Sequence, residues 1–142
     1  MTENEQRQAV IAEAMTWLCT PYLHHASVKG VGVDCAQILI EVYSAVGMAE
    51  KVDVGEYPID WAMHRSDERY LGWIEKYARR VEVPLPGDIA LWKFGRCFSH
   101  AAIVVAWPEI IHSYRGEGVV MGDGLKGALE KRDVLFYSLW GR

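Results

Sequence analysis

The chain has 142 residues, of which 51% are hydrophobic and 24% charged, and its net charge is −4. This length predicts one domain over residues 1–142 with a sizeable core, and this composition excludes a disordered chain. The acidic balance offers no basic field for phosphates, so we expect no nucleic-acid partner. No run approaches the ~20 apolar residues that span a bilayer, so we expect no transmembrane segment.

The N-terminal residues and the cysteine content indicate a reducing compartment. The first ten residues are polar and acidic, and they lack the basic start and apolar run of a secretory signal. The three cysteines are an odd number, which argues against a disulfide framework. We therefore expect a protein that is cytoplasmic as synthesised and has free thiols.

Apolar periodicity predicts three helices in the first part of the chain, over residues 4–19, 35–46 and 66–81. The first should end at Thr20, because the following proline disfavours the helical conformation in the residue before it. Asp34 is a good N-cap type for the second helix, and Gly47 is a good stop. Residues 22–33 between these two helices are predicted to form a loop.

The pattern changes from Pro84 onward. Short runs rich in β-branched and aromatic residues, separated by proline and glycine, predict strands: DIALWKF, AAIVVAW, EIIHSYR and VLFYSLW. The order of elements therefore predicts an α+β fold with N-terminal helices packed on a C-terminal antiparallel sheet. The turn at Pro86-Gly87-Asp88 should lead into the first strand, and we assign it no chemistry.

Cys35 is the first candidate for a catalytic residue. The glycine-rich run KGVGVDC brings it to the N-terminus of the second helix, where unpaired backbone N–H groups stabilise a thiolate. The neighbouring Asp34 opposes this effect, so a nearby imidazolium would be needed to activate the thiol. The alternative is a small buried side chain on the inner face of the helix.

Two histidines could complete such a site. His100 begins one predicted strand and His112 lies in the next, twelve positions later. A three- or five-residue loop centred on Ala106 would place them opposite each other, with Cβ atoms roughly 4.5–5.5 Å apart. A two-residue loop at 107–108 would instead separate them by three positions, and the sequence does not choose. A cysteine, a histidine and a polar orienting group form an activated thiol nucleophile; the alternative is strand histidines with no chemical role.

Four segments in order resemble the NlpC/p-sixty superfamily of papain-like cysteine peptidases, most closely its compact phage-associated branch: TPYLHHASVKGVGVDCAQIL, PGDIALW, HAAIVV and IIHSY. The resemblance runs from about Met15 to Tyr137. It implies a papain-like, NlpC-type fold with Cys35 as nucleophile, His100 as general base and then acid, and His112 as the orienting member. It also implies that Tyr22 and Asp34 line the site and help hold a free amine of the substrate, and no cofactor is expected.

The same resemblance implies a thiol protease that hydrolyses the γ-D-glutamyl to diamino-acid bond of peptidoglycan stem peptides. It further implies phage tail proteins as partners, with delivery to the cell wall in a phage particle. Two departures bear on specificity: Ala36 stands where the family commonly has serine, and residues 23–25 replace an aromatic-glycine stretch. Two alternatives stay open, a catalytically idle tail assembly component and an amidase or acyltransferase acting on another substrate.

A zinc site is a further reading of the cysteines. Cys97 lies three residues before His100, and a C-x-x-H pair could join Cys35 and His112 around a metal. No second close pair of ligands is present in the sequence, so we expect no metal. Cys19, at the end of the first predicted helix, should contribute to packing.

Overall fold

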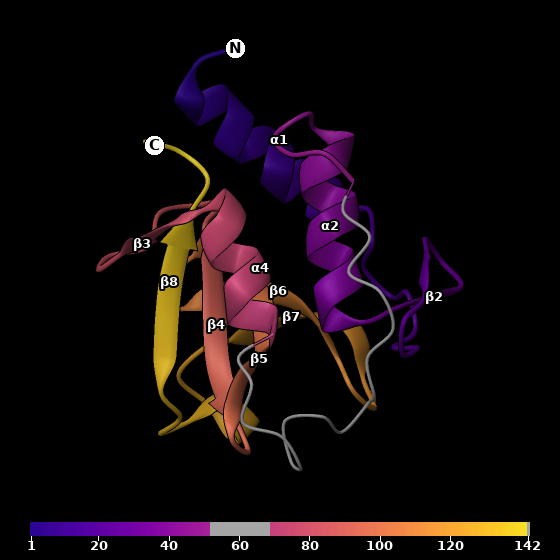
Figure 1. Cartoon of the computed structure of the whole chain (residues 1–142). Helices are drawn as coiled ribbons and strands as arrows, with labels where there is room; N and C mark the ends of the chain where they lie inside the picture. The colour runs from indigo at the N-terminus through magenta and orange to yellow at the C-terminus, as the bar shows by residue number, and fades with distance from the viewer. Residues whose placement is uncertain (52–68, 142) are drawn as a thin grey trace.

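The computed structural model describes residues 1–51 and 69–141. Within these residues, three helices lie against a six-stranded antiparallel sheet whose strand order is β3-β8-β4-β5-β6-β7 (Figure 1), which confirms the α+β prediction. The helices and the 3-10 turn are α1 (Glu3–Met15), α2 (Cys35–Ala45), α4 (Arg69–Tyr77) and η1 (Gly127–Leu129). The sheet strands are β3 (Arg79–Val81), β4 (Ile89–Phe94), β5 (Cys97–Ala106), β6 (Glu109–Tyr114), β7 (Gly118–Asp123) and β8 (Val134–Ser138). A separate two-stranded hairpin is formed by β1 (Ser27–Val28) and β2 (Gly32–Val33).

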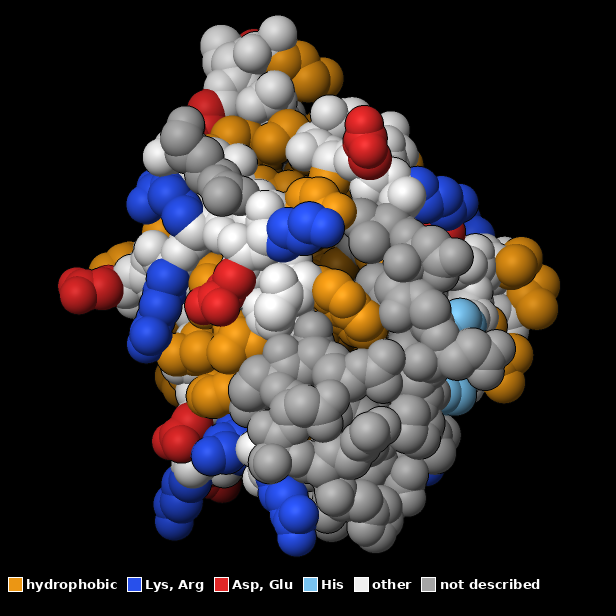
Figure 2. Space-filling model, in the orientation of Figure 1, with side chains coloured by type: hydrophobic (Ala, Val, Ile, Leu, Met, Phe, Trp, Pro, Cys, Tyr) orange, Lys and Arg blue, Asp and Glu red, His pale blue; other side chains and the backbone are white. Residues whose placement is uncertain are grey.

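The core has two parts, one on each face of the sheet. The larger part packs the apolar faces of all three helices against alternate residues of the strands, including Ile38, Ile74 and Ile103. The smaller part, which includes Trp92 and Leu129, covers the opposite face. Within residues 1–51 and 69–141, no helix is both long enough and apolar enough to cross a membrane. On the face shown in Figure 2, Lys and Arg side chains are scattered among acidic and apolar ones.

Helix α1 is shorter than the sequence predicts. Thr2 caps it in a reciprocal arrangement with Glu5, and the helix ends at Met15, well before Thr20. Cys19 then takes a left-handed conformation, and its N–H bonds to the carbonyl of Val119 on β7. The helix ends before this turn because the Val119 carbonyl of β7, rather than a carbonyl of the helix, accepts the hydrogen bond from the Cys19 N–H. The Cys19 side chain is exposed, so the prediction that it contributes to packing is wrong.

The second helix matches its prediction closely, whereas the third differs. Helix α2 starts at Cys35 behind the Asp34 cap, and Gly47 follows its end with a positive φ. Of the predicted helix over 66–81, residues 66–68 lie outside the described part, and α4 ends at Tyr77. Residues 79–81 form β3 instead, because they pair with β8 at the edge of the sheet.

All four predicted strands are present, and they correspond to β4, β5, β6 and β8. The sequence analysis missed β3 and β7, and it assigned the β1–β2 hairpin to a loop. The residues of β7, GVVMGD, carry glycines at both ends of a short run, which gives a weak strand pattern.

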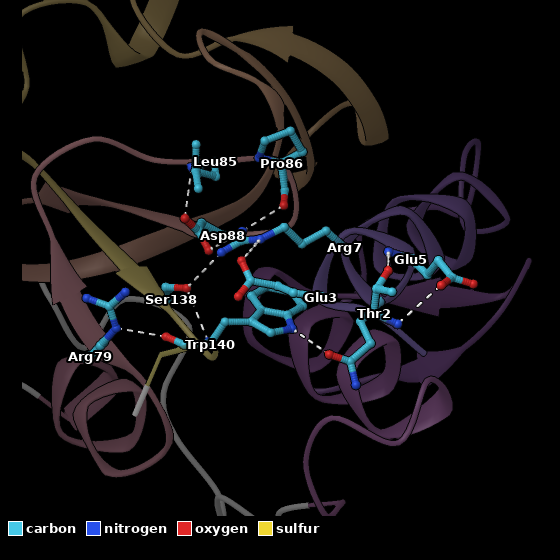
Figure 3. Close-up of polar contacts among 11 residues, drawn as sticks. Thr2, Glu3, Glu5, Arg7, Arg79, Leu85, Pro86, Asp88, Ser138 and Trp140 are labelled. Carbon is cyan, nitrogen blue, oxygen red and sulfur yellow. Dashed lines mark hydrogen bonds and ion pairs between the residues drawn. The ribbon is translucent and has the colours of Figure 1, made fainter.

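A buried arginine fastens α1 to the sheet (Figure 3). Arg7 Nη1 donates hydrogen bonds to the Asp88 carboxylate at 2.8 Å and to the Pro86 carbonyl at 2.9 Å. Its guanidinium carbon lies 4.2 Å from the centre of the Trp140 ring, close to the C-terminus. Both charged side chains are buried, so each depends on the other for compensation of its charge.

The Pro86-Gly87-Asp88 turn is the place where Arg7 binds. The second oxygen of Asp88 accepts a hydrogen bond from the backbone N–H of Leu85 at 2.8 Å, which closes the turn. Gly87 has a positive φ, and a Cβ there would lie 3.4 Å from backbone atoms of Arg7. The turn is therefore a structural site that joins the first helix to the strands.

Replacing Arg7 with methionine should leave the buried Asp88 carboxylate unpaired and lower the free energy of unfolding by about 3–5 kcal/mol. The double variant Arg7→Met/Asp88→Asn should lose less than the sum of the two single losses, because neither charge is then left alone. Urea unfolding followed by circular dichroism measures both. Glu3→Gln is the control, since its half-exposed carboxylate pairs with Arg7 at the surface and should contribute about 1 kcal/mol or less. Additive single losses would contradict this account.

Candidate active site

The segment before Cys35 is held on both sides by backbone and side-chain hydrogen bonds. Val33 pairs with Ser27 in the β1–β2 hairpin, and its N–H bonds to the Pro21 carbonyl at 3.0 Å. The Ser113 hydroxyl on β6 donates to the Val33 carbonyl at 2.6 Å. These bonds fix the chain just before α2 begins, so the position of Cys35 is set by both the hairpin and the sheet.

Asp34 is a buried helix cap, with 1% of its surface exposed. One carboxylate oxygen accepts from the N–H groups of Ala36 and Gln37, and the other accepts from the N–H of His25 at 2.7 Å. The His24 ring lies 3.9 Å from this second oxygen. Both carboxylate oxygens accept from backbone N–H groups, so Asp34→Asn would place an NH₂ group against one of these donors. We therefore expect asparagine to lose one of the hydrogen bonds that cap α2.

The Cys35 thiol donates a hydrogen bond to the Ser99 carbonyl of β5 at 3.5 Å, and the Tyr70 hydroxyl bonds to the Cys35 carbonyl at 2.7 Å. Burial, and then the charge of Asp34, raises the pKa of the thiol to about 12, although backbone hydrogen bonds from Ala101 on β5 and from Cys35 and Ala36 at the helix start lower it. The helix N-terminus therefore does not by itself depress the pKa of this thiol. Desolvation outweighs the helix N-terminus here.

Ser99 is an extra residue in strand β5. Trp92 of β4 pairs with His100, and the next residue, Lys93, pairs with Phe98, so Ser99 lies outside the regular ladder. A β-bulge of this kind redirects the local backbone. The Ser99 carbonyl contacts Cys35, and this places the thiol beside the strand residue that precedes His100. The thiol's hydrogen bond thus goes to the backbone rather than to the His100 ring.

The β5–β6 hairpin contains a second extra residue. Its loop consists of Trp107 and Pro108, because Ala106 pairs with Glu109. Val105 is then passed over, since the next pair joins Val104 to Ile110. The three- or five-residue loop that would set the two histidines directly opposite each other is therefore not formed.

The extra residue decides on which face of the sheet the histidines lie. A two-residue loop alone would separate His100 and His112 by three positions and turn them to opposite faces, because side chains alternate along a strand. Because Val105 is unpaired, the pairing continues from Ile103 and Ile111, and His112 then lies opposite the β5 residue that is two positions from His100. The two side chains share a face, and His100 Nε2 lies 2.8 Å from His112 Nδ1.

Burial keeps both imidazoles neutral. It lowers the pKa of His100 well below 6.5, with the charges of His112 and Arg132 acting in the same direction. Burial also lowers the pKa of His112 to about 4. When His100 carries its proton on Nε2 and donates it to His112 Nδ1, its own Nδ1 has a free lone pair that can accept a proton.

Aromatic contacts fix the orientation of the two rings. Tyr114 stacks on His112 with centroids 5.4 Å apart and meets His100 edge-on at 5.4 Å. The Phe94 ring lies 5.5 Å from His100. Gly122 on β7 leaves room for His112, since a Cβ there would come within 3.1 Å of Nε2. The sequence analysis missed these supporting residues, because their role depends on register rather than on a motif.

Tyr22 lies close to the start of α2. It forms a backbone bridge with Val33, and burial raises the pKa of its hydroxyl above the ordinary value. The negative charges of Cys35 and Asp34 raise this pKa further, whereas Arg115 lowers it. Tyr22, Asp34 and Cys35 are thus close enough to interact, and Arg115 is a further charged group that the sequence analysis did not single out.

The zinc reading finds no support in the geometry. Cys97 is fully buried in the larger part of the core. Across the two described stretches, no group of three or more His, Cys, Asp or Glu side chains is arranged to hold a metal ion.

An apolar pocket lies between α2 and α4, next to this site. Ala36 and Tyr43 of α2 line one side, and Tyr70 and Trp73 of α4 line another. Neither Cys35 nor the two histidines line it. Tyr70 connects the pocket to the site through its hydrogen bond to the Cys35 carbonyl.

No protein-family model and no curated protein sequence matches the chain. Solved structures do match. The NlpC/p60 domain of the peptidoglycan hydrolase SagA is 23% identical with a TM-score of 0.65, and the match covers 91% of this chain and 96% of that one. A protein of the NLP/P60 family from Staphylococcus aureus, described as similar to lipoprotein, is 16% identical with a TM-score of 0.67, over 99% of this chain and 43% of that one. The peptidoglycan hydrolase RipB from Mycobacterium tuberculosis is 13% identical with a TM-score of 0.64, over 96% and 65%. The architecture agrees with the fold expected from the sequence motifs: this chain shares the fold of these NlpC/P60 structures.

Proposed function

We propose that the protein is a cysteine peptidase that hydrolyses an amide bond in peptidoglycan stem peptides, the γ-D-glutamyl to diamino-acid bond. Cys35 is the nucleophile, His100 the general base and then acid, and His112 the group that orients His100. The observation that carries the proposal is the buried 2.8 Å contact between His100 and His112, on strands beside a cysteine at a helix start. The arrangement supplies a thiol, a base and an orienting acceptor.

The first half of the reaction transfers the acyl group to the enzyme. The Cys35 thiol gives its proton to His100 Nδ1 while Sγ attacks the carbonyl carbon of the scissile amide. The backbone N–H of Cys35, at the start of α2, can donate to the oxyanion that forms. His100 then returns the proton to the leaving amine as the C–N bond breaks, and a thioester remains on Sγ.

The second half releases the acid. Water attacks the thioester carbonyl while His100 Nδ1 accepts a proton from it. The C–S bond breaks, and the proton on His100 returns to Sγ, so the enzyme regains its starting state. In both halves His112 Nδ1 accepts the hydrogen bond from His100 Nε2, and it stabilises the His100 imidazolium each time that cation forms. His112 can accept because burial keeps its own ring neutral at pH 7.

Burial disfavours an isolated Cys35 thiolate or an isolated His100 imidazolium, but it strengthens the attraction between the two charges when both form. It raises the pKa of Cys35 and lowers that of His100, so each group alone stays neutral. The attraction between a thiolate and an imidazolium is stronger in the same low-dielectric surroundings. Proton transfer between the two groups is therefore easier than loss of the thiol proton to water.

Two observations support the choice of substrate. SagA and RipB, which share the fold, are named peptidoglycan hydrolases. Tyr22 and the buried Asp34 carboxylate lie beside Cys35, and a carboxylate with a phenol suits the free amine of a short stem peptide.

The phage association of the protein rests on its sequence motifs alone. We propose that it is carried in a phage particle, with tail proteins as partners, and reaches the cell wall on delivery. Proteomics of purified particles from a host that carries the gene tests this. Recovery of the protein in the soluble fraction only would contradict it.

A catalytically idle assembly component is the second candidate. It is favoured by the hydrogen bond of the Cys35 thiol, which goes to the Ser99 carbonyl rather than to the His100 ring. The two candidates differ in whether His100 activates the thiol, and this can be measured directly.

Brief treatment with iodoacetamide at pH 7 should label Cys35 at a rate that depends on His100. Because burial holds the thiol pKa near 12, His100→Ala should lower the rate by at least about 10-fold. His24→Ala is the matched control, and the exposed Cys19 is the internal reference. Peptide mapping by mass spectrometry gives each rate. Equal labelling of Cys35 in the wild type and in His100→Ala would favour the idle component.

The kcat/KM for a synthetic L-alanyl-γ-D-glutamyl-diamino-acid peptide should be limited at acid pH by protonation of His100. Since this pKa is lowered, activity should hold as the pH falls to 6.5 and decline only below it. At pH 7, His100→Ala should lose roughly 10²–10⁴-fold, and His112→Ala less. A midpoint of the acid limb at or above pH 6.5 would contradict the account. Cleavage of other amides but not of this peptide would indicate an amidase or acyltransferase with another substrate.

N-acetylation of the same peptide should lower kcat/KM by roughly 10²–10³-fold, because the buried Asp34 charge then loses its cationic partner. Tyr22→Phe should reduce the difference in kcat/KM between the free and the acetylated peptide, and it leaves the Asp34 cap of α2 intact. Tyr137→Phe is the control, since that hydroxyl bonds to Glu75 on α4 instead. Equal cleavage of free and acetylated peptides would remove amine recognition from the mechanism.

A further inference from the structure

The turn between β6 and β7 is held against the chain that leads to Tyr22. Gly118 has a positive φ, and a Cβ there would lie 2.6 Å from the Thr20 carbonyl. The N–H of Val119 bonds to the same carbonyl at 2.9 Å. In Figure 1 this hairpin extends toward the β1–β2 hairpin beside the start of α2. The turn residues are thus held at the edge of the site.

Arg115 is the cation of this turn. It follows Tyr114, whose ring contacts both His100 and His112, and its charge lowers the pKa of Tyr22. Arg115 is exposed. Among residues 1–51 and 69–141, no acidic side chain forms an ion pair with it. It is therefore an exposed positive charge on the turn that follows the histidine strands, close enough to Tyr22 to affect its pKa.

Two charges of opposite sign lie close to Tyr22. Asp34 places a buried negative charge at the start of α2, and Arg115 places a positive charge on the β6–β7 turn; both charges act on Tyr22. A substrate with an amine and a carboxylate would be oriented by these two charges. A guanidinium can bind a carboxylate through two parallel hydrogen bonds, which fixes direction as well as position.

A γ-glutamyl substrate has such a carboxylate. Its scissile bond uses the side-chain carboxyl group, so the α-carboxylate of the same residue stays outside the peptide chain. We propose that Arg115 binds this free α-carboxylate and makes the enzyme selective for γ-glutamyl residues over their α-amides. The inference rests on the proposed function, and it names a specificity-determining residue for the same site.

The test compares two peptides that differ only at this group, L-alanyl-γ-D-glutamyl-diamino acid with a free α-carboxylate or with an α-amide. The wild type should prefer the free carboxylate in kcat/KM by about 10-fold, as expected for a charge-assisted hydrogen bond. Arg115→Gln should remove most of this preference by slowing the carboxylate substrate alone, and Arg115→Lys should retain part of it. Arg80→Gln, an exposed arginine on β3 at the opposite edge of the sheet, is the matched control and should keep the preference.

Binding to Cys35→Ala separates this inference from the proposed function. Calorimetry should give the free-carboxylate peptide a lower Kd than the amide, and Cys35→Ala/Arg115→Gln should bind both alike. Selective binding without cleavage by the wild type would overturn the proposed peptidase and support the role of Arg115. Equal cleavage and equal binding of the two peptides, or a preference that survives in Arg115→Gln, would overturn the role of Arg115.

Discussion

The candidate site depends on two extra residues in strand β5. Ser99 lies outside the ladder with β4, and its carbonyl receives the Cys35 thiol. Val105 lies outside the ladder with β6, and this shift brings His112 to the same face as His100. Because side chains alternate along a strand, a ladder in which Val105 were paired would turn the two imidazoles to opposite faces of the sheet. One strand therefore sets both the position of the thiol and the contact between the histidines.

The rest of the fold supports this strand from the helical side. Helix α2 holds Cys35 behind the Asp34 cap, and the pair of Arg7 and Asp88 fastens α1 to the turn that starts β4. The burial that results keeps thiol and imidazoles neutral when each is considered alone. The chemistry then rests on proton transfer within the pair rather than on a thiolate that exists beforehand.

The sequence predicts what depends on local pattern. The Asp34 cap, the apolar face of α2 and the four apolar strands follow from periodicity and composition, and they are confirmed. What depends on tertiary pairing could not be predicted in the same way. Residues 79–81 continue a helical pattern yet pair with β8, and Pro86-Gly87-Asp88 looks like a simple turn because its partner Arg7 is far away in sequence. The raised pKa of Cys35 could not be predicted for a related reason: the helix start and Asp34 are visible in the sequence, whereas desolvation, the largest cause, is not.

The protonation state of His100 tests the central claim most directly. Nitrogen-15 NMR of the histidine side chains, with His100 assigned by comparison with His100→Ala, reports which ring nitrogen carries a proton. The account predicts a neutral ring at pH 7 with the proton on Nε2 and a bare Nδ1, and this state should persist below pH 6.5. A doubly protonated His100 ring at pH 7, or a neutral ring with its proton on Nδ1, would contradict it.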